Sequence, residues 1–393
     1  MLRSTRRLIA RPTGSSSPLV LTTSRPTPAM TPSQTLHPFT PPKAKRKPAK
    51  KILEQIIPLA ASRGGRGFLE HLAVTPATAA DYKHRVDRFL RWLCQNSLAV
   101  GSDEEMDMAL VDYLDMEYAS GAASAAATKL LASLGHFLPR YSRHGMGSLP
   151  RAARASKGFQ RLVPAMARPP LPWLGVCAMI GAATAMGFYP LGLFLLLGFA
   201  LYPRPGELLG ICPEQLVPPR PEAGDYAVHW SIHLCPSEWL TPGKTGEFDE
   251  TLLLDWPELR WVTPLMQMLR ARTPGVPVWP FDAVELRRQF ALAASAAQIE
   301  HLKPTPYGLR HGGASHDALT GRRPLSEIKK KGRWRSDQSV RRYEKAAVAM
   351  KQLSRLPQDI MQYAVAVETN LEALLLCQLP PLQPPVRKRQ CDR

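Results

Sequence analysis

The sequence has no acidic residue before Glu54, although the chain is 393 residues long. Its first 53 residues contain eleven Lys or Arg, which is more than half of the formal net charge of +19. The remaining 340 residues keep a charge of +8, so the basic character is not confined to the terminus. A basic surface gains affinity for nucleic acid by releasing the counterions condensed on it. We therefore expect a polyanionic partner, with an anionic membrane surface as the alternative.

Paired cysteines and metal-binding signatures are also missing. The six cysteines are scattered, none of them in a Cys-x-x-Cys pair, and the sequence has no His-x-Glu or paired-carboxylate pattern. This usage favours a reducing compartment and argues against a zinc site or a disulfide framework. We expect neither a metal nor another cofactor.

Charge disappears over one long segment, from Pro169 to Pro203, which includes "LGLFLLLGFALY". Pro190 and several glycines divide it into two pieces of about a dozen residues, too short for a membrane span of about 20. The segment therefore predicts a pair of buried core helices, and we expect no membrane partner.

The two ends of the chain are rich in Pro and in basic residues. The N-terminus "MLRSTRRLIARPTGSSS" has the composition of an organelle transit peptide, but the later "KAKRKPAKK" reads as a nuclear-localisation or DNA-contacting cluster. We predict disordered basic tails over residues 1–52 and 378–393. The expected location is the nucleus or nucleoid, with organelle targeting as the alternative.

The segment "VTPATAADYKHRVDRFLRWL" predicts a helix that Thr75 caps and Pro76 begins. Apolar residues recur there at helical spacing, and basic residues occupy the other faces. Further helical patterns follow, so we predict a small helical domain over residues 66–165. Its candidate DNA-binding residues are Lys83, Arg85, Arg88 and Arg91.

A Pro-rich boundary, "ARPPLPW", separates this region from a second domain that we predict over residues 170–360. After the apolar helices, "DYAVHWSIHL" and "DETLLLD" have the composition of strands on either side of the turn "TPGKTGE". Helical periodicity then returns. The expected fold class is therefore mainly α with a small antiparallel β-sheet, an α+β domain.

Four short motifs in the second domain could carry chemistry: "LYPRPGELLGI", "GKTGE", "TPYGLRHGGASHDAL" and "KKKGRWRSDQSVRRYEKA". Each has an ordinary structural explanation when taken alone. Arg204 and Glu207 have the spacing of a helical ion pair, and Lys244 could be a solvated turn residue. A lone tyrosine in a basic helix, such as Tyr343, usually packs its ring on apolar neighbours and keeps its hydroxyl in water.

Together and in this order, the motifs resemble the active site of tyrosine recombinases of the phage-integrase family, of the mobile-element type. The likeness covers about residues 66–360 and is strongest from Phe199 to Ala346. Trp334 follows Arg310 by 24 residues and precedes Tyr343 by nine, which fits the family closely. The positions that match are Arg204, Glu207, Lys244, Arg310, His311, Trp334 and Tyr343.

The resemblance implies a role for each position. Tyr343 would attack a phosphodiester, Lys244 would protonate the leaving oxygen, and the planar guanidinium groups of Arg204 and Arg310 would neutralise the phosphate. The indole of Trp334 would donate to a phosphate oxygen. A supporting role remains for Glu207, which would orient the arginine.

One position departs from the family pattern, since Tyr307 stands where a histidine is usual. A phenol can donate a hydrogen bond to a phosphate, but at neutral pH it cannot act as a base in the way imidazole can. His311 is the residue that could compensate.

The resemblance also implies a helical core-binding (SAM-like) domain followed by a catalytic domain, clamped on double-stranded DNA. The expected protein is a site-specific recombinase or integrase that forms a 3′-phosphotyrosine, acting as a homotetramer on paired sites. The alternatives are an inactive DNA-binding protein of the same fold and a relaxing enzyme like the type IB topoisomerases. Further DNA-backbone contacts are expected from Lys329, Lys330, Lys331 and Arg333.

Overall fold

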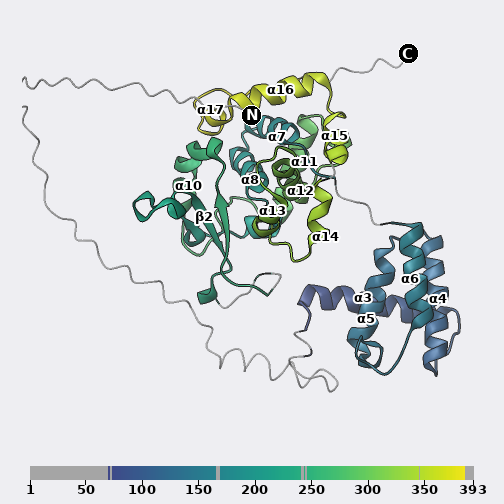
Figure 1. Ribbon diagram of the computed structural model, residues 1–393. Coiled ribbons are helices and arrows are strands. Elements are labelled where there is room, and N and C mark those ends of the chain that lie inside the picture. The colour runs from purple at the N-terminus through teal and green to yellow at the C-terminus, as the bar shows by residue number, and fades with distance from the viewer. Residues whose placement is uncertain are drawn as a thin grey trace, which may run out of the picture. The chain divides into compact units, whose positions relative to one another are not determined.

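The computed structural model describes residue 70 and residues 73–164, 169–239, 243, 246–344 and 346–385, apart from the side chains of residues 226, 342 and 344. The N-terminal tail predicted over 1–52 and the candidate catalytic residue Lys244 lie outside the described residues. The described elements are mostly helices, together with one small sheet (Figure 1). The fold class is therefore α+β, as the sequence predicted.

Helices α3 to α6 share one hydrophobic cluster. They are α3 (Pro76–Gln95), α4 (Asp103–Ala119), α5 (Ala125–Phe137) and α6 (Pro150–Leu162). Thr75 caps α3 as predicted, because its hydroxyl accepts a hydrogen bond from the Thr78 N–H. Phe89 is fully buried in this cluster, where its ring packs against those of Trp92 and Tyr113.

The uncharged segment forms the predicted pair of core helices, α7 (Trp173–Ala185) and α8 (Tyr189–Ala200). Nearly every side chain in them is buried in a second, larger cluster. No helix within the described part of the chain is long and apolar enough to cross a membrane.

The sheet has three antiparallel strands in the order β1 (Leu216–Val217), β2 (Trp230–Leu234) and β3 (Glu250–Leu254). Ile232 lies opposite Leu216 on one side and Leu252 on the other, so all three side chains reach the larger cluster. The sequence predicted β2 and β3. It did not predict β1, because two residues are too few to show the alternation of a strand.

The remaining elements are helices and 3₁₀ helices. The helices are α9 (Pro205–Leu209), α10 (Thr263–Arg270), α11 (Ala283–Ala296), α12 (Pro306–Leu319), α13 (Leu325–Lys331), α14 (Asp337–Val340), α15 (Ala346–Leu353), α16 (Gln358–Thr369) and α17 (Leu371–Leu375). The 3₁₀ helices are η1 (Pro139–Tyr141), η2 (Pro213–Gln215), η3 (Pro221–Ala223), η4 (Asp225–Ala227), η5 (Ser237–Trp239), η6 (Pro257–Val262), η7 (Glu300–Leu302) and η8 (Arg341–Glu344).

Two predicted boundaries need correction at the C-terminal end. Helix α16 packs on α7 and buries Ile360 and Val367, so the domain predicted over 170–360 continues past its expected end. The disordered tail predicted over 378–393 also begins too early. Leu382 packs against the larger cluster, and its carbonyl accepts a hydrogen bond of 3.0 Å from the Tyr363 hydroxyl.

Two adjacent glycines bring α12 unusually close to the layer beneath it. A Cβ atom on Gly313 would lie 2.0 Å from the carbonyl oxygen of Phe199, and one on Gly312 would lie 2.2 Å from that of Leu171. Both obstacles are backbone atoms, which cannot move aside as a flexible side chain could. The glycine pair therefore fixes the depth of α12, the helix that carries Arg310.

We expect Gly313→Ala to destabilise the protein by about 1–3 kcal/mol, because α12 would have to move away from α8. Gly308→Ala in the same helix is the matched control, since its new Cβ would meet its nearest atoms at 3.7 Å, an ordinary contact. Urea unfolding of both variants would measure the difference. Equal stabilities would show that the close approach at Gly313 is not a constraint.

Candidate active site

Arg204 stands directly before α9 and is held by the carboxylate of Glu207. The backbone N–H of Arg204 donates to Glu207 Oε2 at 2.8 Å, and its guanidinium donates to the other oxygen, Oε1. The Arg204 side chain keeps 18% of its surface exposed. One carboxylate thus fixes both the backbone and the side chain of this arginine.

Arg333 joins Glu207 to the first residue of β3. Its guanidinium pairs with Glu207, and its Nη1 lies 2.5 Å from Oε2 of Glu250. The Arg333 side chain is only 8% exposed, and its backbone has a φ of 54°. The sequence predicted a DNA contact here, but the structure places this cation between two carboxylates. Those glutamates are 126 and 83 residues away along the chain, so local sequence could not reveal them.

Glu207 and Arg333 each stabilise the charged form of the other. Burial alone would raise the pKa of Glu207, but hydrogen bonds and charge from Arg333, with the N–H and guanidinium of Arg204, hold that pKa below its usual value. Burial would likewise lower the pKa of Arg333, and Glu207 and Glu250 raise it instead. The bridge is therefore an ion pair network and not a set of neutral hydrogen bonds.

Arg310 is enclosed more completely, with 1% of its surface exposed. Its Nη1 donates to the carbonyl of Tyr202 at 2.6 Å, and its Nη2 donates to the carbonyl of Gly332. The guanidinium carbon lies 4.5 Å from the ring centroid of Trp334. Burial, followed by the charges of Arg333 and Arg204, lowers the pKa of Arg310 to about 10, so the group is protonated at neutral pH.

Lys331 is a second predicted DNA contact that the structure buries. Its ammonium group lies 2.6 Å from Asp255 Oδ1 and 5.2 Å from the ring centroid of Tyr202, with 9% of the side chain exposed. Tyr202 itself has a φ of 34°, which is rare for an aromatic residue. Its hydroxyl donates to Asp317 at 3.2 Å. Lys331 therefore supports the turn that supplies the Tyr202 carbonyl to Arg310.

The candidate nucleophile, Tyr343, lies in η8 against α12. Its hydroxyl oxygen is 2.7 Å from Nδ1 of His311, and its ring centroid is 4.9 Å from that of Trp334. The ring of Tyr307 packs on His311 from one turn earlier in α12, at 5.0 Å between centroids. Only 3% of Tyr343 is exposed. His311 was predicted to have only a supporting part, and the structure places it in direct contact with Tyr343.

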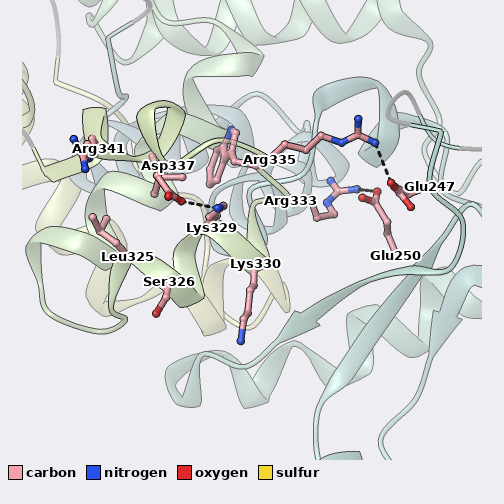
Figure 2. Close-up of a pocket in the computed structure, with 12 residues that line it drawn as sticks. Glu247, Glu250, Leu325, Ser326, Lys329, Lys330, Arg333, Arg335, Asp337 and Arg341 are labelled. Carbon is pink, nitrogen blue, oxygen red and sulfur yellow. Dashed lines mark hydrogen bonds and ion pairs between the residues drawn. The ribbon is translucent and has the colours of Figure 1, made fainter.

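A cleft of about 720 Å³ opens beside Trp334, between α13, α14 and the segment that leads into β3 (Figure 2). Figure 2 shows Arg335 reaching Glu247, at 2.9 Å, next to the pair made by Arg333 and Glu250. Lys329 pairs with Asp337 on the other side. Lys330 also lines this cleft, and its side chain is exposed to solvent. The predicted DNA contact at this residue is therefore sterically possible.

The predicted DNA-binding residues of α3 are mostly engaged by carboxylates. Lys83 lies 2.5 Å from Asp87, and Arg85 lies 3.0 Å from Asp81. The third, Arg88, is 2.7 Å from the buried Glu117, whose charge it neutralises. The fourth, Arg91, donates to a backbone carbonyl.

The described residues contain no group of three or more His, Cys, Asp or Glu that could hold a metal ion. The residues that sequence patterns missed are those that position the others: Glu250, Arg333 as a bridge, and the carbonyls of Tyr202 and Gly332. A spacing pattern carries no signal for such contacts, because they join distant segments.

No protein-family model matches the chain, and no curated protein matches it. Among solved structures, the chain is similar to a protelomerase TelA variant covalently complexed with substrate DNA. The identity is 17% and the TM-score 0.34, over 80% of this chain and 93% of that chain. Similarity at this TM-score does not establish a shared fold.

The buried bridge should contribute far more to stability than its exposed neighbour. We expect Arg333→Met to lower the free energy of unfolding by about 3–5 kcal/mol, because it leaves Glu250 without its cation and Glu207 with Arg204 alone. Arg335→Met should lower it by about 0–1 kcal/mol, since the Arg335–Glu247 pair is solvated. The control joins the same two segments, and its side chains are 70% and 60% exposed. Urea unfolding would measure both, and equal losses would contradict the assignment.

Proposed function

We propose that the protein cleaves and rejoins DNA strands through Tyr343, as a site-specific recombinase or integrase does. The observation that carries the proposal is the contact of 2.7 Å between the Tyr343 hydroxyl and Nδ1 of His311. Arg310 and Trp334 lie beside this contact, with the guanidinium carbon 4.5 Å from the centroid of the indole ring. A phenol, a base in hydrogen-bond reach and a fixed cation form the minimum set for nucleophilic attack on a phosphodiester.

A base is needed because a protonated tyrosine is a weak nucleophile. A phenol with the usual pKa of about 10 is ionised in only about one molecule in a thousand at pH 7. In the proposed step, Nδ1 of neutral His311 takes the proton as the oxygen of Tyr343 attacks phosphorus. The bond from phosphorus to the 5′ oxygen breaks, and a 3′-phosphotyrosine forms. Lys244 is the proposed donor of the proton that the leaving 5′ oxygen requires.

This assignment gives Tyr307 a positioning role. A phenol cannot replace imidazole as the base, but the Tyr307 ring packs on His311 and limits how that ring can turn. His311 therefore supplies the basic group that the family places three residues before the second arginine. The phosphotyrosine keeps the energy of the cleaved bond, so rejoining by another 5′ hydroxyl needs no nucleotide and no metal.

Two arginines are proposed to neutralise the charge that develops on the phosphate. Arg204 is partly exposed, but Arg310 is enclosed by the carbonyls of Tyr202 and Gly332. Residues 332–343 contact Arg310 through Gly332 and Trp334, and they include Tyr343 itself. A shift of this one segment would give DNA access to Arg310 and to the nucleophile together.

The partner in this proposal is double-stranded DNA, and a location in the nucleus or nucleoid follows from it. A homotetramer on paired sites also belongs to the proposal, because exchange between two duplexes requires a nucleophile for each of four strands.

The decisive test is a covalent adduct on a nicked duplex, with a binding site first selected from random DNA by the protein itself. Wild-type protein should form an adduct that survives denaturing electrophoresis, and Tyr343→Phe should form none. Arg204→Ala should react about 100- to 1,000-fold more slowly, as when a preorganised donor is removed. Tyr118→Phe is the control, because this exposed tyrosine lies outside the site. An adduct in Tyr343→Phe, or none in wild type, would overturn the proposal.

The role of His311 predicts a change in pH dependence. In His311→Asn the tyrosine must ionise without a base, so the adduct rate should rise about tenfold per pH unit for as long as most of the phenol stays protonated. Wild type should show a flatter profile over the same range. Single-turnover rates between neutral and alkaline pH would measure this, and two parallel profiles would remove His311 from the mechanism.

The alternatives give different results in the same assays. Salt-sensitive binding that Tyr343→Phe leaves unchanged, with no adduct on any selected site, would indicate an inactive DNA-binding protein. Relaxation of supercoiled plasmid without sequence preference would indicate an enzyme like the type IB topoisomerases.

A further inference from the structure

Helix α6 carries four exposed cations that have no ion-pair partner among the described residues. Its sequence, "PRAARASKGFQRL", contains no acid at all. The four side chains are Arg151, Arg154, Lys157 and Arg161.

The four cations lie on one face of the helix. At about 100° per residue they fall within an arc of about 120°, and at 1.5 Å per residue they extend over about 15 Å. Ala152, Ser156 and Phe159 are buried on the opposite face, in the cluster shared by α3 to α6 or beside it. Packing of the helix therefore directs the whole row of cations towards solvent.

A buried carboxylate fixes the start of α6. Asp107 of α4 is 3% exposed, and its two oxygens accept hydrogen bonds from the N–H groups of Arg151 and Ala152, at 2.9 and 2.8 Å. Further along α6, the ring of Phe159 meets that of Tyr118 edge to face. The cations thus project from a helix that is attached at its first turn and along its length.

Helix α3 offers no comparable surface. Lys83 and Arg85 are about 200° apart around the helix, so they lie on opposite faces. Asp81 and Asp87 already pair with them. Most of the positive charge of α3 is compensated within the protein, whereas that of α6 is not.

We propose that α6 is the helix by which the group α3 to α6 holds the phosphate backbone of duplex DNA. The duplex carries one negative charge for about every 1.7 Å of its axis, so a rigid row of cations about 15 Å long meets several phosphates at once. Three of the four are arginines, whose planar donors suit phosphate oxygens. The inference does not depend on cleavage by Tyr343, and it transfers the predicted interface from α3 to α6.

The experiment compares two matched triple variants of the full chain. One is Arg154→Gln, Lys157→Gln and Arg161→Gln, and the control is Lys83→Gln, Arg85→Gln and Arg91→Gln. Each set removes two arginines and one lysine from the same group of helices. Arg88 stays in the control, because its loss would leave Glu117 buried without a cation. Equal thermal midpoints would establish that both variants are folded.

Fluorescence anisotropy with a random-sequence duplex at several salt concentrations would give the affinities. The α6 variant should bind at least about tenfold more weakly, with a salt slope shallower by about 3, close to 0.9 for each phosphate that is no longer neutralised. The control should change the slope by less than about 1. Equal changes in the two variants, or an unchanged α6 variant, would overturn the proposal.

Two further measurements separate this inference from others. If phosphatidylserine vesicles lose binding in the α6 variant while DNA does not, the partner is an anionic membrane and the proposal fails. At saturating DNA, the α6 variant should reach the wild-type level of adduct. A wild type that binds through α6 but forms no adduct would overturn the proposed strand transfer and leave the α6 interface standing.

Discussion

The candidate site depends first on one guanidinium, that of Arg333, held between Glu207 and Glu250. Through Glu207 it fixes the carboxylate that orients Arg204, and through Glu250 it fixes the start of β3. Its own backbone follows Gly332, whose carbonyl accepts from Arg310. A buried ion pair is intolerant of losing one partner, so this bridge sets the relative positions of α9, β3 and the segment before α14.

Helix α12 supplies the second half of the site under a steric constraint. Because Gly312 and Gly313 let it approach the backbone beneath, Arg310 is placed where the Tyr202 carbonyl can accept its hydrogen bond. Neighbouring residues on a helix normally point about 100° apart, which would separate Arg310 from His311. They nevertheless serve one site, because Trp334 packs over the arginine and Tyr343, nine residues later, reaches the histidine.

The elements that the sequence predicted correctly are those that local periodicity or a single capping residue indicates. Thr75 and Pro76 marked the start of α3, and the uncharged run predicted α7 and α8. Contacts between distant segments could not be predicted in this way. Lys331 looked like a surface cation in a basic stretch, but its partner, Asp255, comes 76 residues earlier.

The pairing of the α3 cations is different, because the sequence itself indicates it. Asp81 and Asp87 lie four residues from Arg85 and Lys83, the spacing at which side chains pair on a helix. Helix α6 has no acid at any such position. Counting each cation together with the acids within four residues therefore favours α6 over α3 from the sequence alone.

The same distinction divides the cations of this basic chain into two sets. Cations with carboxylate partners, such as Arg333 and Lys331, position other groups, and most of their charge is cancelled within the protein. Cations without such partners, as on α6, can release counterions from a duplex without first giving up a carboxylate. Affinity for DNA should therefore follow the exposed, unpaired cations and not the net charge. Substitutions among the unpaired cations can then change DNA affinity, while the paired cations keep the geometry around Tyr343.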